Sequence, residues 1–174
     1  MDFIRVDKQI TLSPLTEADF PIFVSRINDY EGDKNTLSIP HPYTQKDAED
    51  ALAFVEKRSQ KFGKNTSWAI RKNEEVVGGV GFQIYKPSHK TAFGYWLATE
   101  FWNRGVMTKV VEKMCEVAFQ EYGFQRMEAY VEESNFGSAR VLEKCQLKLE
   151  APLIMNYAKK DGELQHCKLF ALTK

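Results

Sequence analysis

Apolar residues recur along this chain at two different spacings, and the changes of spacing divide it into helices and strands. Apolar positions three and four residues apart predict four helices, over about 16–28, 44–62, 105–122 and 136–144. Capping sequences support the first two starts, because Thr16 and Thr44 are each followed three residues later by an aspartate. Gly123 favours the end of the third helix, since glycine readily adopts the left-handed conformation of a helix cap.

Short apolar runs between these helices predict the strands. They cover Gln9–Leu12, Ser67–Arg71, Val76–Tyr85, Thr91–Ala98 and Phe124–Val131, and two final strands surround the turn 160–162. Helices between successive strands imply parallel pairing in part of the sheet, whereas the hairpins imply antiparallel pairing elsewhere. We therefore expect one α/β domain over residues 1–174, built on a mixed sheet with helices on both faces.

Composition narrows the class of protein further. The 24 basic and 24 acidic residues cancel, so no net field attracts nucleic acid or anionic lipid. No apolar run approaches the roughly 20 residues of a membrane span, and the N-terminal residues lack a secretory pattern. The three cysteines are widely spaced, without C-x-x-C pairs, which suits a reducing compartment. These features predict a cytoplasmic protein without nucleic-acid or membrane partners.

The strand that ends near Ala98 runs through a short turn into the helix that starts near Gly105. A helix N-terminus carries unpaired N–H groups and the positive end of the helix dipole, so it suits a phosphate group. Gly105 allows close approach of the backbone and Arg104 adds a cationic donor. The same glycine also fits a plain turn, so the pattern alone leaves both interpretations open.

Two other nucleotide-binding patterns do not fit. The chain has no P-loop sequence, which requires G-x-x-x-x-G-K followed by Ser or Thr. The glycines of Gly78-Gly79-Val80-Gly81 lie inside a predicted strand with no helix behind it. They therefore indicate a bulge or close packing rather than a dinucleotide site.

Two motifs resemble the GNAT superfamily of N-acetyltransferases, and most closely its Rim-type ribosomal-protein N-terminal acetyltransferase branch. The first is G-Y-W-L, five residues, and N-R-G-V-M-T, over 94–108. The second is the run from Asn135 to Glu150, in which a serine, an apolar pair and Glu-Lys follow the asparagine. The segments 12–19 and 41–44 are similar to the opening elements of that branch. The resemblance implies the GNAT fold: a mixed, mostly antiparallel central sheet of about six to seven strands with a splayed parallel pair.

The resemblance also implies acetyl-CoA as cosubstrate and names the residues that would bind it. The pantetheine arm would pair with the backbone of Trp96, Leu97 and Ala98, and Asn135 would hydrogen-bond the same arm. Ser138 would lie near the thioester sulfur. The pyrophosphate would lie over the N–H groups of Asn103, Arg104, Gly105, Val106, Met107 and Thr108.

The chain departs from the branch at several positions. Asn103 and Gln146 stand where the branch usually has glycine, and Ala151 and His166 replace a glycine and an aspartate. The tyrosine that many GNAT enzymes use as general acid falls at Leu142, which cannot donate a proton. These departures raise a second hypothesis, a catalytically silent acyl-CoA-binding sensor or interaction module of the same fold.

Amine acetylation needs stabilisation of an oxyanion, protonation of the leaving thiolate and a neutral amine. We assign the first role to the backbone N–H of Leu97 and the second to Ser138. The general base is open among five side chains and ordered water; the side chains are Glu100, Glu132, Glu133, Tyr157 and His41. Cys145 lacks a histidine partner at motif level, and the histidines and cysteines show no metal-ligand spacing.

The sequence therefore predicts an acetyl-CoA-dependent N-acetyltransferase without a metal. Its acceptor would be a primary amine, either a protein N-terminus or a small amine. The acceptor-side segments 29–43 and 153–165 match no substrate-specific pattern, and we expect a monomer or a homodimer.

Overall fold

The computed structural model describes residues 3–28, 39–84, 89–158 and 164–174, without the side chains of 154–165. The chain forms two compact units, Met1–Gly81 with Tyr95–Arg104 and Phe82–Gly94 with Gly105–Lys174. It passes from one unit to the other inside two strands and again between Arg104 and Gly105. The expectation of one domain over 1–174 stays a prediction.

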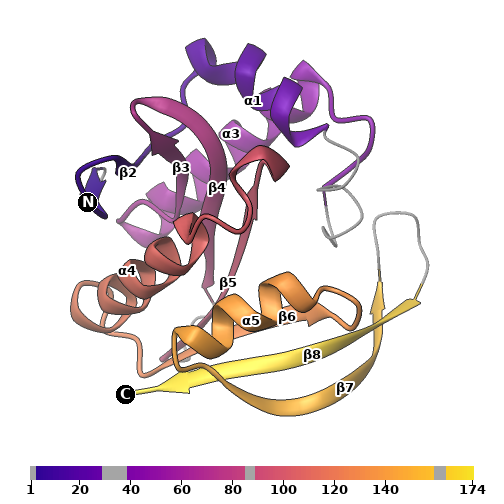
Figure 1. Cartoon of the computed structure of the whole chain (residues 1–174). Helices are drawn as coiled ribbons and strands as arrows, with labels where there is room; N and C mark the ends of the chain where they lie inside the picture. Colours follow the sequence, from indigo (N-terminus) through magenta and orange to yellow (C-terminus); the bar gives the residue numbers. More distant parts are fainter. Residues whose placement is uncertain (1–2, 29–38, 85–88, 159–163) are drawn as a thin grey trace. The chain divides into compact units, whose positions relative to one another are not determined.

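The first unit combines antiparallel strands with two helices (Figure 1). Its elements are β1 (Ile4–Arg5), β2 (Ile10–Ser13), a 3-10 turn η1 (Glu17–Asp19), α1 (Phe20–Ile27), α3 (Gln45–Phe62), β3 (Ser67–Lys72), the start of β4 (Glu75–Ile84), the end of β5 (Lys90–Leu97) and the 3-10 turn η2 (Thr99–Phe101). Apolar residues of α1 form its core together with Tyr43, Ala48, Ala69 and Val76. The predicted helices are confirmed, and Thr44 begins α3 by accepting a hydrogen bond from the Asp47 N–H at 3.2 Å.

The second unit contains two helices and the last three strands of the chain, together with the end of β4 and the start of β5. It contains α4 (Val106–Gln120), β6 (Arg126–Glu132), α5 (Phe136–Lys144), β7 (Lys148–Ala158) and β8 (Leu164–Thr173). β8 lies between β6 and β7 and pairs with both in antiparallel fashion (Figure 1). The apolar stripe predicted for α4 is buried, including Val110, Val111 and Met114, and α4 packs against α5 and β6.

The strand order is β1-β2-β3-β4-β5-β6-β8-β7, which confirms the predicted α/β class with a mixed, mostly antiparallel sheet. The described residues form eight strands, more than the expected six to seven, because β1 was not predicted. β1 has only two residues, too few for a periodic signal, and is defined by its pairing with Leu12 and Thr11 of β2. The parallel pair is β5 with β6, joined over three positions from Lys90↔Arg126 to Ala92↔Glu128.

The glycines of β4 allow the backbones of β4 and β5 to approach closely. A Cβ added at Gly78 would come within 2.4 Å of the carbonyl oxygen of Trp96, and one at Gly79 within 2.7 Å of the Trp96 indole nitrogen. No side chain fits at such distances, so the predicted close packing is confirmed. β3 and β4 also shift register between Ile70 and Arg71, which indicates a bulge.

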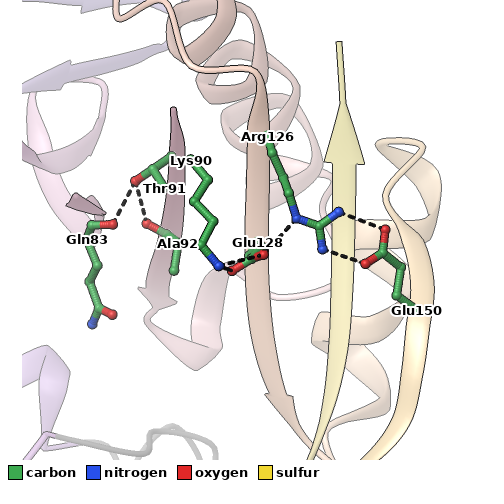
Figure 2. A network of polar contacts seen from close by, with 7 residues as sticks. All are labelled: Gln83, Lys90, Thr91, Ala92, Arg126, Glu128 and Glu150. Carbon is green, nitrogen blue, oxygen red and sulfur yellow. Dashed lines mark hydrogen bonds and ion pairs between the residues drawn. The ribbon is translucent and has the colours of Figure 1, made fainter. Parts of the chain in front are cut away.

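A network of charged side chains lies on the three paired positions of β5 and β6 (Figure 2). The buried carboxylate of Glu128 accepts hydrogen bonds from Lys90 Nζ at 3.2 Å and Arg126 Nε at 2.7 Å. Arg126 also binds both carboxylate oxygens of Glu150 on β7, at 2.9 and 2.5 Å. Burial by itself raises the pKa of Glu128, but the bonds from Arg126 and Lys90 outweigh it and lower the pKa. Glu128 is therefore ionised, and its carboxylate links the two parallel strands through hydrogen bonds with Lys90 and Arg126.

Every helix in the described segments is too short or too polar to span a membrane.

Candidate functional site

The end of β5 directs its backbone groups to two opposite edges. The N–H of Ala98 donates to the carbonyl oxygen of Val77 on β4 at 2.9 Å, and the carbonyl of Trp96 lies against Gly78 of the same strand. Successive residues of an extended strand point their backbone groups in opposite directions, so those of Leu97 point away from β4. The Leu97 carbonyl accepts a hydrogen bond from Trp102 Nε1 at 2.7 Å. Of the three residues predicted here, Leu97 therefore presents its N–H on the edge away from β4.

The turn between β5 and α4 contains two residues in the left-handed region. Asn103 has φ 57° and Gly105 has φ 72°. Asparagine tolerates this conformation better than most residues, which explains how Asn103 can replace the glycine usual in the family. Residues 103–105 are exposed. Left-handed residues in a turn aim successive N–H groups toward one side, a backbone arrangement suited to an anion.

The N-terminus of α4 lacks a side-chain cap. Its N-cap is Gly105, and its first turn contains no acidic residue. In contrast, Thr44 caps α3 and Asn135 caps α5 with side-chain oxygens. The first intrahelical bond near this end runs from the Lys109 N–H to the Gly105 carbonyl at 3.3 Å. The N–H groups of 106–108 therefore have no intrahelical acceptor and suit a negatively charged ligand.

The side chains of this first turn serve a different purpose. Val106 and Met107 are buried and Thr108 is half-buried. Val106 and Met107 can therefore bind a phosphate only through their backbone, while their side chains anchor the helix. Apolar side chains at this turn are therefore compatible with the predicted phosphate role.

The N-terminus of α5 brings Asn135 and Ser138 together. The Asn135 side-chain oxygen accepts a hydrogen bond from the Ser138 N–H at 2.9 Å. This bond fixes the amide orientation and leaves the Asn135 NH₂ group as the donor for any ligand. Ser138 is half-buried in the first turn of α5.

The predicted residues belong to both compact units. Those from Trp96 to Arg104 belong to the first, and those from Gly105 to Thr108 belong to the second together with Asn135 and Ser138. Within each unit, the structure brings together the end of β5 with the turn after it, and the two α5 residues with each other.

The candidate general bases have different surroundings. Glu100 forms an ion pair with Arg26 at 3.0 Å, so its carboxylate is already engaged. Glu132 accepts a hydrogen bond from Ser134 Oγ at 3.2 Å, whereas the Glu133 side chain is exposed. The side chain of Tyr157 lies outside the described residues. His41 is exposed.

All three cysteines are buried, and Cys145 lies at the C-terminal end of α5. Burial raises the pKa of Cys145 to about 11 and that of Cys115 to about 12, so both are thiols at neutral pH. In the described part of the chain, no group of three or more His, Cys, Asp or Glu residues could hold a metal ion.

Sequence reasoning missed two structural roles at this site. The indole of Trp102 donates a hydrogen bond to the Leu97 carbonyl, and a tryptophan five residues after a strand end carries no recognisable signal for this role. Arg26 was not singled out, although it bonds Glu100 in the turn before α4. An arginine on the last turn of an otherwise uncharged helix was the available signal.

Comparisons with known proteins agree with this geometry. The family described as "Acetyltransferase (GNAT) domain" matches residues 9–148. The chain is 29% identical over 106 residues, 60% of its length, to "Uncharacterized N-acetyltransferase p20" of Bacillus licheniformis. It is 40% identical over 74 residues, 41% of its length, to "Probable N-acetyltransferase YjcK" of Bacillus subtilis (strain 168). The aligned regions span 59% and 41% of these two curated relatives.

Solved structures share the fold at low sequence identity. The Microcin C7 self immunity acetyltransferase MccE, in complex with acetyl-CoA and AMP, superposes with a TM-score of 0.85 at 19% identity, over 98% of this chain and 96% of that one. The ribosomal L7/L12 alpha-N-protein acetyltransferase RimL, in complex with coenzyme A, gives a TM-score of 0.83 at 16% identity, over 99% and 98% of the two chains. With the family match over most of the sequence, these findings establish that the chain belongs to the GNAT acetyltransferase family.

Proposed function

We propose that this protein transfers an acetyl group from acetyl-CoA to a primary amine by direct attack. The observation that carries the proposal is the segment from Asn103 to Thr108. There, a turn with two left-handed residues leads into a helix whose first N–H groups have no side-chain cap. A side-chain cap satisfies some of these N–H groups at many helix starts. Here no side chain caps them, so they are left to water or to a ligand such as a pyrophosphate.

The solved relatives support the choice of ligand. The MccE structure contains acetyl-CoA and the RimL structure contains coenzyme A. Both have this fold, and the present chain has an arginine beside the uncapped helix start, at Arg104. We infer that the pyrophosphate binds the N–H groups of 103–108 and that the Asn135 NH₂ group donates to the pantetheine arm.

The reaction needs a donor for the oxyanion that forms on the thioester. The Leu97 N–H is suited to this role because it points away from β4 and its neighbouring carbonyl is fixed by Trp102. A donor that is held in place before the reaction stabilises developing charge without reorganisation.

The leaving thiolate needs a proton, and Ser138 is the candidate donor at the start of α5. The incoming amine must lose a proton as well. Because Glu100 is paired with Arg26, we favour ordered water, Glu132 or Glu133 over Glu100 as the acceptor of this proton.

A second function is favoured by one residue. Leu142 stands where many GNAT enzymes carry a tyrosine, and it is completely buried. A protein that keeps the acyl-CoA site but lacks this proton donor would serve as a sensor or interaction module. The two functions differ in turnover, not in acetyl-CoA binding.

Two measurements separate these functions. Binding of acetyl-CoA to the native state would raise the melting temperature in proportion to the logarithm of ligand concentration. Release of the CoA thiol is then followed with a panel that includes peptides with a free N-terminus and small polyamines. Binding with turnover on one amine class supports the transferase, binding without turnover on any amine supports the sensor, and no thermal shift contradicts both.

Substitution of Ser138 tests its role directly. We expect Ser138→Ala to lower turnover by about 10²-fold while acetyl-CoA binding is kept, as for loss of a general acid. Ser25→Ala is the control, because Ser25 is an exposed serine of α1 in the first unit. Unchanged turnover in Ser138→Ala would remove Ser138 from the mechanism.

A further inference from the structure

Arg26, in the last turn of α1, gathers four partners around one guanidinium group. Its side chain is only 12% exposed. Its Nε donates to Glu100 Oε1 at 3.0 Å, and its Nη2 lies 3.2 Å from Glu75 Oε2. Its Nη1 donates to the carbonyl of Val76, and its Cζ lies 5.2 Å from the centre of the Phe101 ring.

Two of these partners belong to η2, the single turn between β5 and the proposed phosphate-binding segment. Glu100 is held through its carboxylate and Phe101 through a cation–π contact. Within this turn, the Phe101 N–H donates to the Ala98 carbonyl at 2.9 Å and the Trp102 N–H donates to the Thr99 carbonyl at 3.0 Å. Asn103 follows one residue later, in the left-handed conformation.

We propose that Arg26 is a positioning residue for acetyl-CoA, because it fixes η2 and thereby the direction in which the chain enters Asn103–Gly105. This inference rests on the proposed function. In this proposal Arg26 acts through η2, the turn that precedes the phosphate-binding N–H groups.

The shape of the arginine side chain is essential to this role. The planar guanidinium presents several donors in a fixed fork while its face rests on an aromatic ring. In Arg26 the fork reaches two carboxylates and one carbonyl oxygen on two segments of the first unit, η2 and the start of β4. A lysine ammonium has one centre and cannot reproduce these directions, so charge alone is insufficient.

Arg71 provides a matched control for a purely stabilising arginine. Its side chain is 17% exposed and it also lies in the first unit. It binds both carboxylate oxygens of Asp19, at 2.8 and 2.7 Å, and Ser13 Oγ at 2.7 Å. These partners lie at β2 and η1, so loss of Arg71 would weaken the fold without releasing η2.

The test compares Arg26→Gln, Arg26→Lys and Arg71→Gln in the full chain. Calorimetry gives the dissociation constant for coenzyme A, and thermal denaturation gives stability. Hydrogen exchange of the peptide over 99–108, without ligand, measures how rigidly the turn is held.

We expect both Arg26 variants to bind coenzyme A about tenfold more weakly, because small displacements of a binding segment cost affinity. Their amides over 99–108 should also exchange faster. Arg71→Gln should lose comparable stability but keep the affinity and the exchange rate over 99–108.

Equal affinity loss in Arg26→Gln and Arg71→Gln would overturn the inference, as would full rescue by Arg26→Lys. If Arg26→Gln fails to fold, Glu100→Gln replaces it, because the Glu100 carboxylate is 58% exposed and forms one of the contacts between Arg26 and η2. On this inference, Glu100→Gln must still weaken coenzyme A binding. If the wild-type protein does not bind coenzyme A, the proposed function is refuted. The exchange comparison then still decides whether Arg26 holds the turn.

Discussion

The indole nitrogen of Trp102 donates a hydrogen bond to the carbonyl oxygen of Leu97 at 2.7 Å. This bond closes the turn at the end of β5 and fixes the peptide group next to the proposed oxyanion donor. The Leu97 N–H therefore depends on a side chain five residues later in the sequence.

Replacement of Trp102 by phenylalanine keeps an aromatic ring but removes the donor. We expect turnover to fall by about tenfold, since a misplaced oxyanion donor loses part of its effect. Stability should fall by about 1 kcal/mol, the usual net value of one hydrogen bond. Steady-state kinetics and urea unfolding check both values. Phe54→Leu, at another exposed aromatic residue of the first unit, should leave turnover unchanged.

Gln146 occupies a position that favours glycine. Its φ is 66°, and it ends α5 with two bonds typical of a Schellman motif: Gln146 N–H to the Glu143 carbonyl and Leu147 N–H to the Leu142 carbonyl, both at 3.0 Å. Because glycine adopts this conformation without strain, Gln146→Gly should raise the free energy of unfolding by about 0.5–1 kcal/mol. Chemical denaturation measures the change; a loss of stability would mean that the Gln146 side chain makes a compensating contact.

Gly78 on β4 should not tolerate a side chain. An alanine Cβ would come within 2.4 Å of the Trp96 carbonyl oxygen, so β4 and β5 would have to separate locally. We expect Gly78→Ala to cost about 1–3 kcal/mol, as for other overpacked sites. Gly94→Ala on β5 is the control, because a Cβ there meets no atom within 4 Å. Equal stability of the two variants would contradict the close approach.

The Asp19–Arg71 pair predicts a specific acid sensitivity. Burial by itself raises the pKa of Asp19, but hydrogen bonds from Arg71 and Thr16 outweigh it and lower the pKa to about 2 from 3.8. A carboxyl group whose pKa is lower in the folded state stabilises the fold at any pH above its pKa in the unfolded state. This stabilisation disappears as the pH falls through its pKa in the folded state. It amounts to at most about 2 kcal/mol. The stability advantage of the wild type over Asp19→Asn should therefore shrink between pH 5 and pH 2, and a constant difference would argue against it.

The thiols should react slowly in the native protein. Cys115, Cys145 and Cys167 are buried, and burial raises the pKa of the first two to about 12 and about 11. Alkylation reagents attack the thiolate, so labelling at pH 8 should be slow until denaturant is added, when all three cysteines react. Cys145→Ala should also keep full turnover. Rapid native labelling of Cys145, or lost activity in the variant, would reopen a nucleophilic role.

Local sequence features were sufficient for most elements. The apolar periods and the capping residues Thr16 and Thr44 located α1 and α3, because a cap and an amphipathic stripe act within a few residues of each other. α5 agreed with its predicted range, and the remaining strands agreed within a few residues. β1 was missed because two residues form a strand only through their partner in β2.

The sequence by itself determined the fold class and the candidate phosphate-binding segment, since a strand, a turn and a helix start follow one another along the chain. Only the tertiary structure decided which backbone groups at the end of β5 already form hydrogen bonds within the protein. It also showed that α4 starts without a side-chain cap, and that Arg26 contacts η2 from 74 residues away in the sequence. These relationships join segments that are distant in sequence. Hydrogen bonds and ion pairs of this kind depend on where folding places the atoms, and residue order along the chain does not encode that placement locally.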